Sequence, residues 1–160
     1  TKPDVVIPML HGAAGEDGTL RDVLSALQIP YVGSTPDACR VSFDKPVAKS
    51  IVAATGISVP TGVALPHATF RELGADSVMA AVLDRVGLPA MVKPARGGSA
   101  QGANIVTEPS QLPSALVGAF AYGEVAVIER FIEGTEVSKP IMDEVMGSYM
   151  IYDLTKVKEG

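Results

Sequence analysis

The apolar positions in the first third of the chain predict a strand, a helix and a second strand. Residues 5–10 form an apolar run that ends at His11-Gly12, which is typical of a buried parallel strand that delivers a loop at its carboxyl end. Apolar residues then recur at helical spacing over 19–27, and residues 29–33 have the composition of a short strand. Open parallel sheets are built from this order of elements, so we expect an α/β unit here.

Two further helices are expected before the first boundary in the chain. Residues 34–43 have a helical pattern, and Asp44 can cap a second helix over 45–55. The stretch 56–60 begins with glycine and ends with proline, as a linker does. We therefore place the first unit, an open and partly parallel α/β domain, at residues 1–56.

The remainder of the chain alternates strands and helices in an α+β pattern. Strands are expected at 59–65, 90–92, 105–106 and 125–132, and helices at 77–86 and 110–121. Ser110 is expected to cap the last of these helices. The run at 125–128 and the strand at Val5 would ordinarily need covering neighbours, so we expect exposed apolar surface at both. The second unit is predicted to span 57–138, and a shorter segment, 139–160, follows it.

Composition and charge narrow the possible partners. The 160 residues are 47% hydrophobic and 19% charged, which allows a sizeable core in one large or two small domains. A net charge of -5 provides no overall basic surface for nucleic acid or anionic lipid, and no apolar run approaches the length of a membrane span. The single cysteine, Cys39, cannot form an internal disulfide and favours a reducing compartment such as the cytoplasm.

A glycine-rich stretch at 91–102 is the most informative segment for chemistry. It joins two expected strands, and Lys93 lies at the end of the first one. Glycines allow backbone N–H groups to approach an anion, and a lysine fixed on a strand adds positive charge, so this loop suits a phosphate. It lacks the lysine and hydroxyl residue of a Walker loop and the helix-opening glycines of the dinucleotide fingerprint. The alternative is an ordinary flexible hairpin with a surface lysine.

Two further loops follow apolar strands. Residues 11–18 lie at the carboxyl end of the first strand, where ligands of open parallel sheets gather, although His11 by itself could simply bond to its own loop. Residues 129–136 place acidic side chains after the last strand, where a carboxylate can accept hydrogen bonds from a ribose or an amino group, unless the turn is only solvated. Lys45 and Lys49 share a helix face one turn apart, a spacing that usually serves solubility.

Two other chemistries are disfavoured by the residues present. The two histidines and the single cysteine show no metal-ligand spacing, and His67 lies in an expected loop, so no structural zinc site is predicted. Ser99 has no sequence-visible base beside it and no nucleophile-elbow motif around it, which argues against a serine hydrolase. We assign no metal ligand in the chain.

Five motifs, in this order, resemble the D-alanyl-D-alanine ligases of the ATP-grasp superfamily. They are His11-Gly-x-x-Gly-Glu-Asp-Gly18, Tyr31-Val-Gly-Ser34, Asp44-Lys45, Lys93-Pro-Ala-Arg-Gly-Gly-Ser99 and the stretch from Glu129 to Glu136. The resemblance implies that ATP phosphorylates the carboxylate of one D-alanine and that the amine of a second attacks the acyl phosphate, for peptidoglycan synthesis. It also implies a central ATP-grasp domain, a cytoplasmic enzyme and a homodimer.

The resemblance implies roles for individual residues as well. Lys45 and Lys93 would bind the ATP phosphates, and Gly98 and Ser99 would lie in the loop over the reacting phosphate. Ser99 would act in catalysis by helping to position the substrate. The residues that would contact the amino acid substrate are His11, Gly12 and Ser99. The adenine and ribose contacts would come from Glu129, Arg130, Phe131, Ile132 and Glu136.

Departures from the family pattern leave alternatives open. Ala100 stands where the family has a second serine that helps to hold the carboxylate of the second substrate, so a ligase for another acid and amine is one alternative. A nucleotide-binding module without ligase activity is the other, because residues 139–160 match the family only loosely and their acidic residues lack a spacing suited to magnesium. The resemblance places the Mg²⁺ ligands beyond Gly160.

Overall fold

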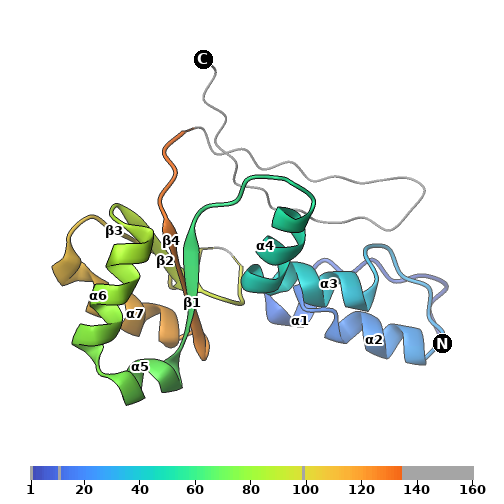
Figure 1. Cartoon of the computed structure of the whole chain (residues 1–160). Coiled ribbons are helices and arrows are strands. Elements are labelled where there is room, and N and C mark those ends of the chain that lie inside the picture. Colours follow the sequence, from blue (N-terminus) through green and yellow to red (C-terminus); the bar gives the residue numbers. More distant parts are fainter. Residues whose placement is uncertain (1, 11, 99, 135–160) are drawn as a thin grey trace. The chain divides into compact units, whose positions relative to one another are not determined.

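The computed structural model describes residues 2–10, 12–98 and 100–134. Backbone contacts divide the chain into two compact units, one containing Thr1–Asp44 and the other Lys45–Glu133 (Figure 1). Helix α4 (Lys45–Ala54) therefore lies in the second unit, whereas the sequence pattern placed it in the first. Within the described residues, no helix is both long and apolar enough to cross a membrane.

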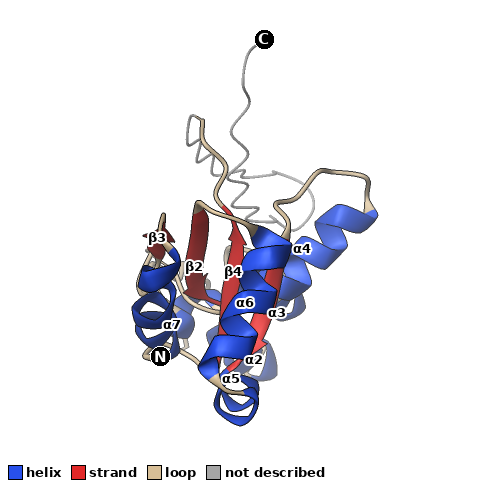
Figure 2. Cartoon of the chain, turned by 60° about the vertical axis from the view of Figure 1, so that its left-hand side comes forward, coloured by secondary structure: helices blue, strands red, loops and turns tan. Residues whose placement is uncertain are grey.

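The second unit is built on a four-stranded antiparallel sheet (Figure 2). Its strands, in spatial order, are β1 (Gly62–Pro66), β4 (Val125–Arg130), β2 (Ala90–Pro94) and β3 (Asn104–Val106). The last strand in the sequence, β4, lies between β1 and β2 and pairs with both. Helices and strands alternate around this sheet, which confirms the α+β pattern predicted for the second unit.

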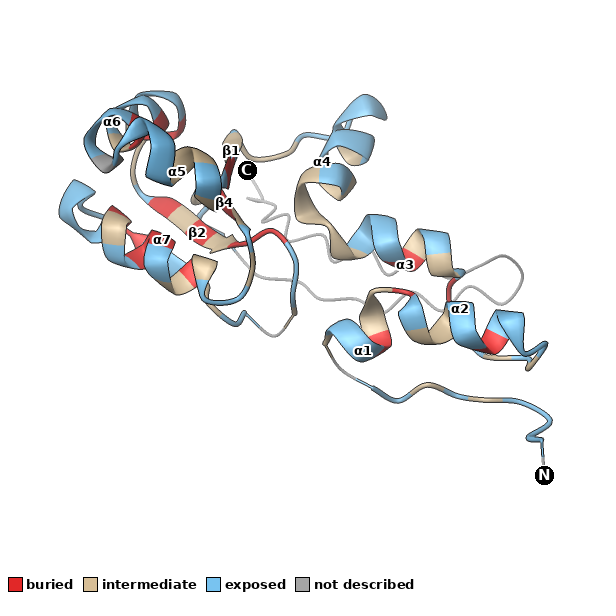
Figure 3. Cartoon of the chain, turned by 90° about the horizontal axis from the view of Figure 1, so that it is seen from below, coloured by how far each residue is buried: buried red, intermediate tan, exposed pale blue. Residues whose placement is uncertain are grey.

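Helices α6 (Ala75–Val86) and α7 (Leu112–Phe120) pack on one face of the sheet and enclose the core (Figure 3). Because side chains alternate along a strand, Ala126 and Ile128 of β4 both point toward these helices. The largest fully buried side chains are Leu112, Leu116, Ile128, Val86, Val92 and Val106. Burying one such side chain contributes about 2 kcal/mol, so this layer is the main source of stability in the unit.

The length and the position of β4 overturn two expectations. The strand ends at Arg130 rather than at 132. Ala126, Val127 and Ile128 are at most 3% exposed, so the exposed apolar surface expected at 125–128 is absent. An apolar run shows that a strand needs cover, but it does not show whether the chain itself supplies that cover, as it does here.

Two helix starts also differ from the sequence prediction. His67, expected in a loop, opens α5 (His67–Leu73), and its ring stacks on Phe120 with 4.6 Å between the ring centroids. Ser110 does not cap α7, because it lies inside a 3₁₀ turn, η1 (Pro109–Gln111). The side chain of Gln111 accepts a hydrogen bond from the backbone N–H of Glu108 and so closes a capping box around that turn.

The first unit contains three helices, α1 (Ala13–Glu16), α2 (Thr19–Ala26) and α3 (Pro36–Phe43). The hydroxyl of Thr35 accepts a hydrogen bond from the backbone N–H of Ala38, which caps α3 as expected for a threonine before a proline. The helical periodicity of 19–27 and 34–43 is thus confirmed.

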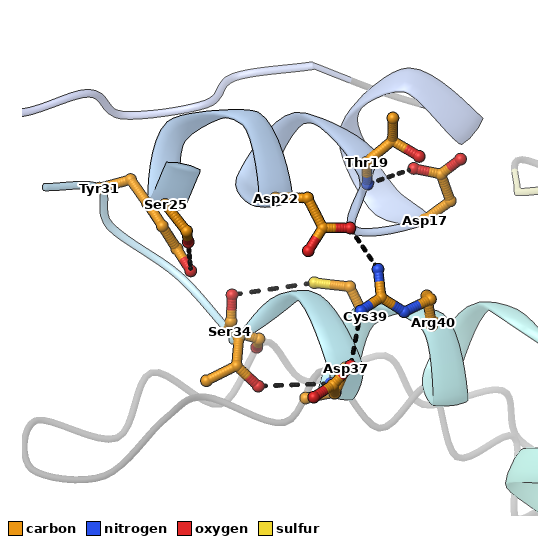
Figure 4. Close-up of polar contacts among 11 residues, drawn as sticks. Asp17, Thr19, Asp22, Ser25, Tyr31, Ser34, Asp37, Cys39 and Arg40 are labelled. Carbon is orange, nitrogen blue, oxygen red and sulfur yellow. Dashed lines mark hydrogen bonds and ion pairs between the residues drawn. The ribbon is translucent and has the colours of Figure 1, made fainter. Parts of the chain in front are cut away.

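Polar contacts tie α2 to α3 (Figure 4). The guanidinium of Arg40 pairs with Asp22 of α2 and with Asp37 of its own helix. The Cys39 thiol is buried and donates to the carbonyl oxygen of Ser34. Burial raises the pKa of this thiol, with Arg21 acting in the opposite direction, so Cys39 stays protonated at neutral pH.

The first segment of the chain is less regular than its apolar run predicted. Val6 and Tyr31 form one isolated parallel bridge, so the parallel direction expected for this pair is confirmed. Neither segment forms a strand. Met9 is 83% exposed, so the exposed apolar surface expected around Val5 is present. A run of apolar residues becomes a buried strand only when neighbours cover both of its faces.

Candidate functional site

The face of the sheet opposite α6 and α7 carries charged side chains. Since Ala126 and Ile128 point into the core, alternation along β4 turns Val127 and Glu129 to the other face. In the register of β2 and β4, Lys93 lies opposite Val127 and therefore on the same face. Lys93 and Glu129 are thus diagonal neighbours on adjacent strands, where long side chains can meet.

Three side chains on this face form one ion-pair cluster, the Lys49–Lys93–Glu129 cluster. The Lys93 ammonium pairs with Oε1 of Glu129, and the Lys49 ammonium lies 2.7 Å from Oε2. Lys49 also donates to the carbonyl oxygen of Pro60 over 2.9 Å. The Glu129 side chain is 7% exposed, whereas those of Lys93 and Lys49 are 19% and 25% exposed. A buried carboxylate is therefore held between two lysines that keep partial access to solvent.

The electrostatics of the cluster fix the charge of Glu129. Burial by itself favours the neutral acid and raises the pKa of Glu129. The charge of Lys93, the hydrogen bonds from both lysines and the charge of Lys49 outweigh burial, so the pKa of Glu129 lies below its ordinary value. Glu129 is thus a carboxylate at neutral pH, and the cluster keeps one net positive charge. Such a site suits an anion that lies beside a hydrogen-bond donor.

A glycine on the neighbouring strand makes room for the cluster. Gly62 of β1 lies opposite Glu129 in the strand register. A Cβ atom at this position would lie 2.8 Å from the carbonyl oxygen of Ile128 and 3.1 Å from Nζ of Lys49. Side chains essentially never approach a backbone oxygen this closely. The absence of a side chain at Gly62 therefore lets Lys49 reach across β1 to the carboxylate.

Helix α4 sends its two lysines to different parts of the site. Lys49 reaches Glu129, and Lys45, one turn earlier, donates from Nζ to the carbonyl oxygen of Gly97 over 2.9 Å. The backbone N–H of Lys45 donates to the carbonyl oxygen of Ala95. The start of α4 is therefore joined to the glycine-rich loop, and the spacing that suggested only solubility instead links two segments distant in sequence.

The glycine-rich loop has the backbone that its composition predicted. It connects β2 to β3, and Gly97 has a φ of 121°, a conformation that side chains rarely allow. Ala100 also adopts a left-handed conformation, with a φ of 55°. A loop with such backbone angles can turn N–H groups toward an anion.

A cavity of about 320 Å³ lies between α4 and strands β1 and β4. Its wall includes Lys49 of the cluster, and most of the other residues that line it are apolar, among them Ala53, Val59, Ala64 and Val127. The volume is at the lower end of the range for small-molecule sites. The cluster therefore borders a concave and largely apolar space.

The remaining predicted site residues are not drawn into the cluster. Arg130 is exposed, Phe131 is half-buried, and Ile132 is 40% exposed on the segment that continues from β4. Gly98 lies half-buried in the glycine-rich loop, and Gly12 precedes α1 in the first unit with a φ of 77°. The expected site residues His11, Ser99 and Glu136 lie outside the described residues.

Lys49 is the residue that the sequence interpretation missed. Its one-turn spacing from Lys45 was visible, but nothing in the sequence showed that α4 would lie across β1 from a buried carboxylate. Among the described residues, no group of three or more histidine, cysteine, aspartate or glutamate side chains could hold a metal ion.

Comparison with protein families gives two matches. Residues 1–34 match the family described as D-ala D-ala ligase N-terminus, and residues 51–158 match D-ala D-ala ligase C-terminus. The D-alanine–D-alanine ligase of Geobacter sulfurreducens is 38% identical over 149 residues, which cover 92% of this chain and 45% of that relative. The corresponding ligase of Shouchella clausii is 34% identical over 139 residues, covering 87% and 37%. The chain thus spans less than half the length of these relatives.

Solved structures agree with the family matches. The VanG D-Ala:D-Ser ligase from Enterococcus faecalis superposes with a TM-score of 0.74 at 33% identity, covering 84% of this chain and 38% of that one. The D-alanine-D-alanine ligase from Coxiella burnetii gives a TM-score of 0.73 at 30% identity, covering 84% and 39%. The mixed helix and sheet arrangement is therefore that of the ATP-grasp ligases, as expected. The match over residues 51–158 alone covers more than half of this chain, which therefore belongs to the D-alanyl-D-alanine ligase family.

Proposed function

We propose that this chain provides the nucleotide-binding region of an ATP-dependent ligase that joins two D-alanines for peptidoglycan precursor synthesis. The observation that carries the proposal is the Lys49–Lys93–Glu129 cluster, because its members Lys93 and Glu129 are residues that the family resemblance assigns to ATP. Under this proposal, residues 1–56 derive from the N-terminal substrate-binding domain, although α4 within this range packs in the second unit. Residues 57–138 form the central ATP-grasp domain, and 139–160 belong to its C-terminal part.

The described residues suit an adenine nucleotide. Lys93 can pair with phosphate oxygens, and Glu129, as a buried carboxylate, can accept a hydrogen bond from the adenine amino group. The apolar cavity beside the cluster supports a base in this region. We assign Lys45, Lys93, Gly98 and Ser99 to the phosphates and the loop over them. We assign Glu129, Arg130, Phe131, Ile132 and Glu136 to the adenine and the ribose.

ATP would supply the phosphoryl group that activates the carboxylate of the first D-alanine. In this scheme His11, Gly12 and Ser99 bind and orient the amino acid, and Ser99 helps to hold it for attack by the second amine. Protein dipoles and lysines stabilise the charge on the transferring phosphate. Mg²⁺ is part of the proposed reaction, but the described residues contain no acidic cluster that fits it, so no step is assigned to a metal ligand of this chain.

The proposed setting is the cytoplasm, and the proposed assembly is a homodimer. ATP is available in the cytoplasm, and the single buried thiol, Cys39, suits a reducing compartment. We propose a small amino acid as the substrate partner and neither nucleic acid nor membrane lipid, because the net charge of -5 offers no general attraction for polyanions.

A ligase for a different second substrate is the main competing candidate. Ala100 lacks the hydroxyl that the family serine offers to the second carboxylate, and one structural neighbour is described as a D-Ala:D-Ser ligase. Dipeptide formation from D-alanine together with each member of a panel of D-amino and hydroxy acids separates this candidate from the first. A nucleotide-binding module without ligase activity would bind ATP and release no phosphate with any of them.

The test of the proposal is D-alanine-dependent ADP release by the full-length protein that carries this sequence. Lys93→Ala is expected to reduce turnover at least about a hundredfold, because a preorganised positive charge on the phosphates is lost. Lys2→Ala is the matched control, since Lys2 donates to the carbonyl oxygen of Leu27 in the first unit. This substitution is expected to leave turnover unchanged. Turnover that survives in Lys93→Ala would reject the assignment.

A further inference from the structure

We propose that Lys49 is a positioning residue for the nucleotide, which keeps the Glu129 carboxylate in place and ionised when the phosphates draw Lys93 away. The inference rests on the proposed function of the cluster and adds a residue that the family motifs do not assign. It also gives helix α4 a part in binding the nucleotide, through a side chain that acts on Glu129.

The two lysines hold Glu129 in different ways. Lys49 is itself fixed by two acceptors, Oε2 of Glu129 at 2.7 Å and the carbonyl oxygen of Pro60 at 2.9 Å. Those acceptors come from β4 and from the segment before β1, so the ammonium is held from two sides. Lys93 approaches the other oxygen, Oε1, from β2. The carboxylate can therefore lose Lys93 and still keep the partner on its second oxygen.

The charge balance makes Lys49 necessary in the bound state. An anionic ligand that recruits the Lys93 ammonium competes with Glu129 for it, and so weakens one of the two ion pairs that hold the carboxylate. A buried carboxylate without a positive partner would take up a proton, and the neutral acid is a weaker hydrogen-bond acceptor. With Lys49 in place, Glu129 remains an anion and can accept from an amino group of the base.

The surroundings of Glu129 leave few other groups for this task. Among the described residues, the charged groups that face its carboxylate are Lys49 from α4 and Lys93 from β2, while β1 contributes Gly62 at this point. A Cβ atom at Gly62 would lie only 3.1 Å from Nζ of Lys49. The close approach of this lysine therefore depends on the space that a glycine leaves at this position of β1. A lysine that served only solubility would not require a glycine on the neighbouring strand.

The experiment compares Lys49→Met, Lys49→Arg and wild type in the full-length protein, measuring kcat and KM for ATP across the acid limb of the pH profile. Lys49→Met is expected to raise KM for ATP about tenfold with kcat little changed, and to move the acid limb of kcat/KM up by about one pH unit. Lys49→Arg, which keeps the charge, restores both. Lys2→Met, the same substitution at a lysine that contacts Leu27, changes neither.

A double-mutant cycle separates this role from a structural one. Because Lys49 acts through Glu129, adding Lys49→Met to Glu129→Gln is expected to leave KM for ATP where Glu129→Gln alone sets it. The double variant buries no lone carboxylate, so its comparison with Glu129→Gln remains possible even if Lys49→Met by itself fails to fold. A further rise in KM in the double variant overturns the inference.

The outcomes also distinguish this inference from the proposed function. A wild-type protein that turns over no ATP rejects the proposed function and the inference together. Wild-type turnover with an unchanged KM and an unchanged acid limb in Lys49→Met rejects the inference alone.

Discussion

Glu129 is a buried side chain that stays charged because two lysines reach it from different elements. Its carboxylate is almost inaccessible to water, which by itself would favour protonation. Lys93 meets it across the sheet and Lys49 meets it from α4, so a strand and a helix both contribute to keeping it ionised. The stability of the second unit is therefore coupled to the protonation of one residue.

This coupling predicts how stability depends on pH. The pKa of Glu129 is lower in the folded protein than in the unfolded chain, so its contribution is complete above the unfolded pKa, about 4.3, and is lost as the pH falls through the folded pKa. Glu129→Gln is expected to lower the free energy of unfolding by about 3 kcal/mol at neutral pH, because two partly buried ammonium groups lose their partner. The difference from wild type should shrink as the pH falls below about 4.

Urea unfolding at several pH values measures this difference. Glu124→Gln is the matched control, because Glu124 is a carboxylate whose side chain is 92% exposed on the same unit. That substitution should change the free energy of unfolding by less than about 0.5 kcal/mol. A wild-type advantage over Glu129→Gln that stays constant into acid would contradict the assigned charge.

At the scale of elements, the site depends on how closely α4 and the edge strand β1 approach Glu129. Gly62→Ala is expected to destabilise the protein by about 2 kcal/mol, because the new methyl group would meet the backbone of Ile128 and the ammonium of Lys49. Gly123→Ala is the control, since a Cβ at Gly123 meets nothing within 4 Å. Thermal unfolding of both variants tests the point, and equal melting temperatures would count against the tight approach at Gly62.

Elements with their own local signal were predictable from the sequence. Helix α2 has apolar residues at helical spacing, and α6 is capped by Gly87, whose N–H donates to the carbonyl oxygen of Leu83. Helix α5 was missed because its start at His67 depends on a distant contact, the stacking of that ring on Phe120. Local patterning fixes helices that carry their own periodicity and caps, whereas tertiary packing decides the others.

The site was predictable only in part, for a related reason. Lys93 and Glu129 stood out because each ends or follows an apolar strand, and the structure brings them together. Lys49 carried no such signal, because its importance comes from the strand order β1-β4-β2, which puts a strand from the end of the unit at its centre. That order arises from pairings between residues far apart in the chain, which periodicity does not encode.

At the scale of the whole molecule, the two units differ in how much apolar surface they bury. The second unit has a continuous core that joins α6 and α7 to all four strands. Among the described residues of the first unit, only Leu24 and Cys39 are buried apolar side chains. Since buried apolar area is the main source of stability, the two units should not open with the same free energy.

Hydrogen exchange followed residue by residue tests this difference. Amide protons in β2 and β4 should exchange only when the second unit unfolds, whereas those in α2 and α3 should exchange at least about a hundredfold faster after correction for intrinsic rates. Leu116→Ala provides the internal check: it removes a fully buried side chain of α7 and should cost about 3 kcal/mol. This loss of stability should accelerate amide exchange in β2 and β4 and leave the exchange rates in α2 and α3 unchanged. Acceleration of both sets to the same degree would mean that the units unfold as one cooperative body.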